Sequence, residues 1–159
     1  MYKRYSALVL SILMVSLFMI GMKPVSITQA ASSSGLANGT YTLKYDVLKA
    51  ENNSVSMAND YFEKPAKLYV KNGKMTMQVQ LNHSEWTTQF KVKYKGKIMD
   101  TKVIQSNSKK DTRIVQFPIA DIKNPIVSKI HVTVSSYNYD HDYTIRLALD
   151  QKSLKAIKK

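Results

Sequence analysis

The sequence predicts an all-β fold, an immunoglobulin-like antiparallel β-sandwich. Short segments alternate between apolar and polar residues, turn signals separate these segments, and helical periodicity is almost absent. About seven or eight such segments in one domain are typical of a sandwich. The protein has no cysteine, so it lacks the disulfide of a true immunoglobulin domain and must be held by its core alone.

The first predicted strand covers residues 40–49, in which every second residue from Tyr41 to Val47 is apolar or aromatic. Residues 56–62 are too few for a full helix, and Pro65 limits any extension. We therefore expect a single helical or 3₁₀ turn there.

A hairpin is predicted around Asn72-Gly73, because this dipeptide between two alternating runs is the strongest short hairpin signal. Its strands are expected at 67–71 and 75–81. The next strand is expected at 86–94, with three residues of the same parity on one face: Trp86, Phe90 and Val92. The remaining strands are expected at 98–105, 113–119, 130–134 and 143–149, with a polar loop at 106–111 and a break at Asn124-Pro125.

The N-terminal residues indicate a targeting segment. Lys3 and Arg4 precede an apolar run over residues 7–22, and residues 28–30 are of the kind that a signal peptidase recognises. The run is shorter than the roughly 20 apolar residues of a spanning helix, which leaves an uncleaved anchor as the alternative. The predicted organisation is a signal peptide at 1–30, a flexible lead-in at 31–38, one domain at 39–150 and a basic C-terminal tail at 151–159.

The formal net charge is +13, from 24 Lys and Arg against 11 Asp and Glu. For an exported protein, the expected counterpart of this charge is an anionic envelope polymer or lipid surface; the alternative is that the charge only keeps the protein soluble. Aromatic residues do not interleave with the lysines, so we expect no nucleic acid partner. The lack of cysteine excludes a thiolate nucleophile, a thiolate metal site and haem attached through cysteine.

Tyr139 and Tyr143 stand four residues apart at the start of the last predicted strand. Side chains on a strand alternate between faces, so the two phenols are expected on the same face. One oxygen can bind a hard ferric ion as phenolate, as tyrosine does on haem iron, while the second hydrogen-bonds to the first. The alternative is that aromatic residues are simply common in strands.

Three motifs, in this order, resemble the NEAT (near-iron transporter) family of the haem-uptake systems of Gram-positive bacteria, of the iron-regulated surface determinant (Isd) type. They are Ser56-Met57-Ala58-Asn59-Asp60-Tyr61-Phe62 with Lys64-Pro65-Ala66, then Ser84-Glu85-Trp86-Thr87-Thr88-Gln89-Phe90, then Tyr139-Asp140-His141-Asp142-Tyr143 with Ile145-Arg146-Leu147. The resemblance covers residues 39–150. It implies a short 3₁₀ lip over a haem pocket in the sandwich.

The resemblance also implies a role for each site residue. Tyr139 would be the axial ligand of ferric haem b, and Tyr143 would hydrogen-bond to its oxygen. On the lip, Ser56 would bind a haem propionate, Met57 would lie over the distal face and Tyr61 would pack near the porphyrin. The remaining residues would line the floor and the edge of the pocket: Ile130, Val132, Val134 and Trp86.

Each role has a structural alternative. Met57 could fill a gap under a loop, and Ser56 could cap the short turn. Trp86 and the three aliphatic residues could be core only, and Tyr61 could serve either purpose. His141 is a rival iron ligand, because histidine is the commonest haem ligand; the resemblance places the iron on Tyr139 instead. His83 and His131 are expected to be surface or strand-face residues.

The function predicted first is a non-enzymatic haemophore or envelope haem relay, which takes haem from haemoglobin or other host haemoproteins and passes it to other NEAT-domain carriers. A second hypothesis is an adhesive sandwich that binds haemoglobin or another partner without haem. A third is an enzyme, for which the sequence offers no recognisable constellation. The chain shows no wall-sorting motif, so secreted or envelope-associated protein is expected.

Overall fold

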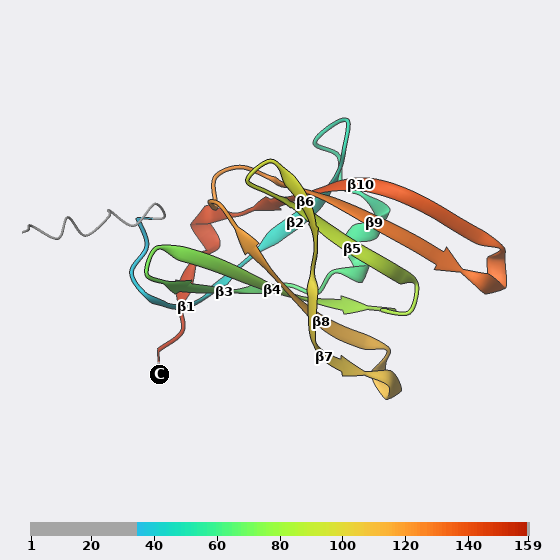
Figure 1. The fold of residues 1–159 in the computed structure, drawn as a ribbon, viewed down its shortest axis with the longest axis horizontal. Coiled ribbons are helices and arrows are strands. Elements are labelled where there is room, and N and C mark those ends of the chain that lie inside the picture. Colours follow the sequence, from blue (N-terminus) through green and yellow to red (C-terminus); the bar gives the residue numbers. More distant parts are fainter. Residues whose placement is uncertain (1–34, 159) are drawn as a thin grey trace, which may run out of the picture. The chain divides into compact units, whose positions relative to one another are not determined.

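The computed structural model describes residues 35–158, which form one domain (Figure 1). The predicted signal peptide and the first part of the lead-in lie outside the described residues. The first seven strands are β1 (Gly39–Leu43), β2 (Tyr45–Lys49), β3 (Ala66–Lys71), β4 (Lys74–Asn82), β5 (Thr87–Tyr94), β6 (Lys97–Asp100) and β7 (Lys102–Asn107). The others are β8 (Thr112–Ile119), β9 (Ile126–Val134), β10 (Tyr139–Leu149) and β11 (Lys155–Ala156).

Four 3₁₀ turns complete the described part of the chain: η1 (Met57–Tyr61), η2 (Ser108–Lys110), η3 (Ser135–Tyr137) and η4 (Gln151–Ser153). Within residues 35–158 no helix has the length and apolar character needed to cross a bilayer. The predicted 3₁₀ turn forms at Met57–Tyr61, where the Ser56 side chain caps its start and the Phe62 N–H donates to the Asn59 carbonyl at its end.

The strands form two antiparallel sheets packed as an immunoglobulin-like sandwich, as the alternation predicted. The six-stranded sheet has the order β11-β1-β3-β4-β8-β7, and the five-stranded sheet has the order β2-β10-β9-β5-β6. The apolar positions of both sheets meet in one core. In Figure 1, β9 and β10 run side by side as a long hairpin that ends at η3.

An aromatic chain crosses the core between the sheets. Phe62 meets Phe90 of β5 edge to face at a centroid distance of 5.4 Å, and Phe90 meets Phe117 of β8 at 5.6 Å. All three rings are buried. Without a disulfide, such packing supplies the connection between the sheets.

The predicted Asn72-Gly73 hairpin is confirmed. Both residues have positive φ, 51° and 73°, as a two-residue turn between right-twisted strands requires. The predicted inward face of the returning strand is also confirmed, since its four apolar side chains are buried: Met75, Met77, Val79 and Leu81.

Two single strands predicted from the sequence are each divided between the two sheets. The segment 40–49 breaks at Lys44, whose N–H donates to Ser153 Oγ and whose C=O accepts from the Asp150 N–H. The segment 98–105 breaks at Thr101, whose N–H and hydroxyl both donate to the Phe90 carbonyl. The chain thus crosses from one sheet to the other while the alternation continues.

The predicted place of Trp86 in a strand is wrong. β5 begins at Thr87, and a bulge between Thr87 and Gln89 shifts the register against β9. Because a bulge adds one residue to one strand, Trp86 does not share the face of Phe90. It lies half-buried in the turn before β5.

The described sheet extends beyond residue 150. Lys155 and Ala156 of β11 pair with Thr42 and Tyr41 of β1, after the η4 turn. This places part of the basic C-terminal segment at the edge of the six-stranded sheet.

Candidate functional site

The β9–β10 hairpin brings the two predicted tyrosines together. Tyr139 pairs with Val134 and Tyr143 pairs with Ile130, so both phenols lie on the face that β10 turns toward the core. Their hydroxyl groups are hydrogen-bonded to each other. The even spacing in the sequence is therefore realised as a direct contact.

The contact between the phenols determines the state of Tyr139. The hydrogen bond with Tyr143 raises the pKa of Tyr139 above its ordinary value, and partial desolvation adds to this. At neutral pH Tyr139 is therefore a neutral phenol that is hydrogen-bonded to Tyr143. A cation that takes the Tyr139 oxygen as phenolate must displace this proton, and Tyr143 can then donate to the phenolate.

His141 lies on the same face as the two tyrosines. It pairs with Val132, and its ring centroid lies 4.5 Å from that of Tyr139 and 6.4 Å from that of Tyr143. The shared face follows from its position two residues from each tyrosine, so His141 is well placed as the rival ligand considered from the sequence. The structure makes it the imidazole nearest to the phenol pair.

The three predicted floor residues follow one another along β9 on this face and differ in burial. Ile130 belongs to the core, whereas Val132 and Val134 are half-buried. Their apolar surface becomes more accessible toward the η3 end of the hairpin, where Tyr139 begins β10. A flat apolar ligand could therefore contact Val132 and Val134 without opening the core.

The lip lies at η1 and is fixed by its own backbone contacts. Ser56 Oγ accepts from the Ala58 N–H at 3.2 Å, and the Ser56 N–H donates to the Val47 carbonyl at 2.8 Å. The capping role is therefore present, and it leaves the lone hydroxyl proton of Ser56 available to a ligand. Met57 is 81% exposed, so it fills no gap in the described structure.

An aromatic cluster connects the lip with β9. Tyr61 meets Trp86 edge to face at 5.6 Å, and Trp86 stacks on His83 at 4.6 Å. The Trp86 carbonyl accepts from the Thr133 N–H of β9 at 2.8 Å. Within residues 35–158 no hydrogen bond or ring contact joins Ser56 or Met57 to the tyrosine pair.

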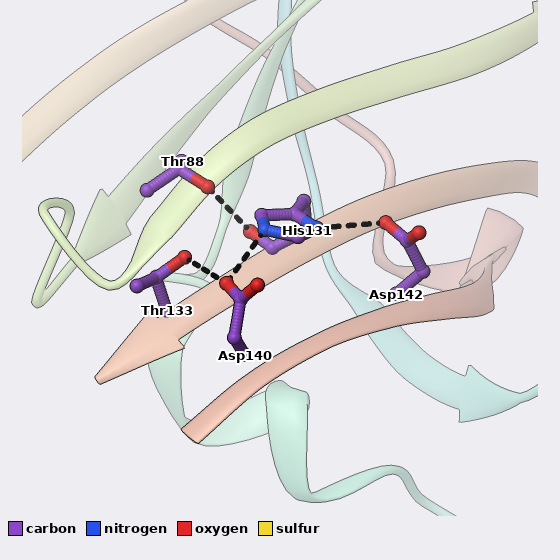
Figure 2. A network of polar contacts seen from close by, with 5 residues as sticks. All are labelled: Thr88, His131, Thr133, Asp140 and Asp142. Carbon is purple, nitrogen blue, oxygen red and sulfur yellow. Dashed lines mark hydrogen bonds and ion pairs between the residues drawn. The ribbon is translucent and has the colours of Figure 1, made fainter. Parts of the chain in front are cut away.

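The outer face of the same hairpin carries a charged network, which Figure 2 shows. His131 Nδ1 lies 2.8 Å from Asp142 Oδ1, and its Nε2 lies 2.9 Å from Asp140 Oδ1. The Thr133 hydroxyl donates to the same oxygen of Asp140 at 2.7 Å, and the Thr88 hydroxyl donates to the His131 carbonyl. Since both ring nitrogens face carboxylates, an imidazolium that donates from both fits this site.

The two carboxylates raise the pKa of His131, with the Asp142 hydrogen bond as the largest cause, while Thr133 and His131 lower the pKa of Asp140. Folding therefore raises the His131 pKa, so its stabilisation is complete below the unfolded-state pKa of about 6.5 and disappears as the pH rises through the folded-state value. The contribution of Asp140 is present above its unfolded-state pKa and is lost as the pH falls through its folded-state value.

We expect Asp142→Asn to lower the pKa of His131 toward the ordinary value, because it removes the strongest of the interactions that favour the imidazolium. Asp140→Asn should lower it less. NMR titration of the histidine ring resonances measures both, and His83 serves as an internal reference. An unchanged His131 pKa in both variants would mean that the network does not exist in solution.

Within residues 35–158, no group of three His, Cys, Asp or Glu side chains is arranged to hold a metal ion. The donor set of the inner face is instead a hydrogen-bonded phenol pair beside an apolar floor. This set fits an oxidised iron that brings its own equatorial ligands and needs one hard oxygen donor and an apolar surface.

The fold and this hairpin define the class of protein: a β-sandwich that presents a phenol pair on its last hairpin. The chain belongs to the NEAT family. The model of this family, described as an iron transport-associated domain, matches residues 34–151. This confirms the resemblance drawn from the three motifs.

Relatives with known names are similar over most of the described domain. "Hemin/hemoglobin-binding protein 1" of Listeria monocytogenes is 39% identical over 132 residues, which cover 82% of this chain and 62% of that protein. "Iron-regulated surface determinant protein C" of Staphylococcus aureus is 35% identical over 120 residues, 72% of this chain and 51% of the relative. The chain thus spans less than two thirds of the length of either relative.

Among solved structures, the NEAT5 domain of IsdX2, a B. anthracis hemophore in complex with heme, superposes with a TM-score of 0.70. It is 34% identical in sequence, and the match covers 72% of this chain and 97% of that one.

Proposed function

We propose that this protein binds ferric haem b non-covalently and passes it on without catalysing a reaction, with the Tyr139 oxygen as iron ligand. The observation that carries the proposal is the hydrogen-bonded phenol pair on the last hairpin of a NEAT domain. Relatives named for hemin binding and a haem-bound neighbour of the same fold support it.

In this proposal Tyr139 and Tyr143 act as a unit. When haem is bound, its ferric iron supplies the positive charge that makes a phenolate the favoured ligand. Tyr139 would then release its proton to solvent, and the Tyr143 hydroxyl would donate a hydrogen bond to the phenolate oxygen and disperse its charge. A hard phenolate favours oxidised over reduced iron, so reduction should weaken binding and help the protein to release its cargo.

The other predicted residues would hold the porphyrin. Val132 and Val134 offer apolar surface beside Tyr139, at roughly 25 cal/mol for each Å² removed from water, while Ile130 supports them from the core. Ser56 would donate its hydroxyl proton to a propionate, and the exposed Met57 would cover the distal side. Tyr61 and Trp86 would contact the edge of the pocket through the cluster that connects the lip with β9.

The names of the relatives support a proposal for the route of the haem. Their names include hemin and hemoglobin binding and an iron-regulated surface determinant. We accordingly propose that the protein is secreted or associated with the cell envelope, that it acquires haem from haemoglobin or another host haemoprotein, and that it delivers haem to another NEAT-domain carrier.

Titration of the purified protein with hemin tests this function. We expect a Soret band that saturates at one haem per protein and a resonance Raman spectrum with phenolate-to-iron modes. Absence of a saturable band would refute haem binding. A spectrum typical of imidazole ligation, lost in His141→Ala, would instead retain haem binding and refute Tyr139 as the ligand.

The name of the Listeria relative favours one second candidate, recognition of haemoglobin itself. In that case the haem-free protein captures haemoglobin whose haem is held in a form that cannot transfer, such as the carbonmonoxy form. Capture together with no uptake of free hemin would favour a purely adhesive role. Uptake of free hemin without capture of haemoglobin would support only the carrier role.

A further inference from the structure

The two sheets carry very different charges. The six strands of the larger sheet contain no Asp or Glu, whereas the strands of the five-stranded sheet contain Asp46, Asp100, Asp140 and Asp142. Five lysines lie in the larger sheet at positions that the pairing places on its outer face: Lys67, Lys71, Lys74, Lys102 and Lys155. The strands of the larger sheet therefore present five lysines on one face and contribute no carboxylate of their own to it.

Strand register aligns part of this face into a continuous row. Successive cross-strand partners, from one edge of the sheet to the other, are Lys155, Thr42, Lys67, Gln78, Gln116 and Lys102. Since partners in antiparallel strands point to the same side, lysines stand at both ends of the row and amides at its centre. With neighbouring strands about 4.8 Å apart, the row offers a straight track across the sheet.

Next to the row lies an open hollow of about 620 Å³, lined among others by Tyr69, Lys71, Lys74 and Gln116. Its base is a chain of hydrogen bonds: the Tyr69 hydroxyl donates to Gln78 Oε1 at 3.1 Å, and Gln78 Nε2 donates to Gln116 Oε1 at 2.8 Å. Within the described chain, the Gln116 amide nitrogen makes no hydrogen bond, so its two N–H groups remain available to donate to a ligand in this hollow.

Lys71 and Lys74 are direct cross-strand partners beside the Asn72-Gly73 turn. Like charges directly opposite each other destabilise a sheet. Within residues 35–158, none of the five lysines forms an ion pair that would relieve this repulsion. A bound anion at this pair would relieve the repulsion.

From this charge, register and hydrogen-bonding pattern we propose that the outer face of the six-stranded sheet binds a linear polyol phosphate polymer. Lysine binds phosphate as a compact point charge, without the fixed geometry that a planar arginine fork requires. Arg113 and Arg146, the arginines of the described chain, donate instead to backbone carbonyls. The glutamine and threonine side chains between the lysines match the hydroxyl groups of a polyol.

A nucleic acid contains the same phosphodiester group as the proposed polymer, but this face lacks the other features that nucleic acid binding requires. Binding of single-stranded nucleic acid needs several aromatic platforms, and among the described outer positions of these strands Tyr69 alone is aromatic. The face also lies on the sheet that does not contain the β9–β10 hairpin, so its occupation does not require haem. The protein would thereby be held to an anionic surface while the haem site stays accessible.

The test measures the affinity of the purified protein for immobilised poly(glycerol phosphate). Lys71→Gln with Lys74→Gln should weaken binding about 30-fold, as expected for two lysines at an anionic surface. The matched control, Lys93→Gln with Lys97→Gln in the five-stranded sheet, removes the same charge and should change binding by about twofold at most. NMR amide shifts on adding the polymer should cluster on β3, β4 and β8.

An equal loss in both double variants would overturn the proposal, because the polymer would then respond to net charge alone. Binding of equal strength to single-stranded oligothymidylate or to phosphatidylglycerol vesicles would also overturn it. Circular dichroism checks that the variants fold. The hemin spectrum should stay unchanged in both, which separates this proposal from the haem-binding function.

Discussion

Replacing Tyr139 with phenylalanine is expected to lower the affinity for ferric haem by more than about 100-fold, since removing even the groups that support a ligand costs about 10-fold to 100-fold. The substitution removes one oxygen and keeps the ring that lies 4.5 Å from His141. The fold should therefore remain, while the phenolate-to-iron bands disappear. Hemin titration followed by absorbance and resonance Raman spectroscopy measures both effects.

Two variants on the same face serve as controls. Tyr143→Phe removes only the hydrogen bond to the ligand oxygen, so it should keep the phenolate bands and weaken binding about tenfold or more, the range of a hydrogen bond to a charged group. His141→Ala should leave the ferric spectrum unchanged. If the spectrum survived in Tyr139→Phe and vanished in His141→Ala, the imidazole would be the ligand and the assignment would be wrong.

Phe117→Ala is expected to destabilise the fold by about 3–5 kcal/mol, the usual cost of emptying a large aromatic site in a core. Phe117 is 1% exposed and closes the edge-to-face chain that reaches from β8 through Phe90 to Phe62. A domain of this size has a total stability of about 5–15 kcal/mol, so the variant should lose a large part of it. No disulfide limits the effect.

Urea unfolding followed by tryptophan fluorescence measures this loss, because Trp86 is the single tryptophan and contacts Tyr61 at the end of the lip. Tyr137→Ala is the control: this residue is 79% exposed in η3, and its removal should change stability by no more than about 0.5 kcal/mol. A similar small change in Phe117→Ala would show that the aromatic chain does not hold the sheets together.

The hairpin of the site has two chemically different faces because neighbouring residues of β10 alternate. Tyr139, His141 and Tyr143 face inward, while Asp140 and Asp142 face outward and hold His131 between them. The outward contacts join β9 to β10 at the same positions as the phenol pair. They are therefore expected to keep the two tyrosines in register before haem arrives.

The sequence by itself determined what depends on local spacing. Period-two alternation placed Tyr139 and Tyr143 on one face, and Asn72-Gly73 defined a hairpin. The three motifs around Ser56, Trp86 and the two tyrosines were together sufficient to identify the family. These features are local because each follows from a few consecutive residues and the geometry of a strand or turn.

Only the tertiary structure decided which strands meet. Strand pairing decided that the chain passes from one sheet to the other at Lys44 and Thr101. It also decided where the bulge moves Trp86 out of β5 and how His131 comes to lie between two aspartates. The row of lysines and glutamines likewise exists only through the register of six strands. Alternation along one strand leaves its neighbour undefined, because pairing is set by contacts between residues far apart in the chain.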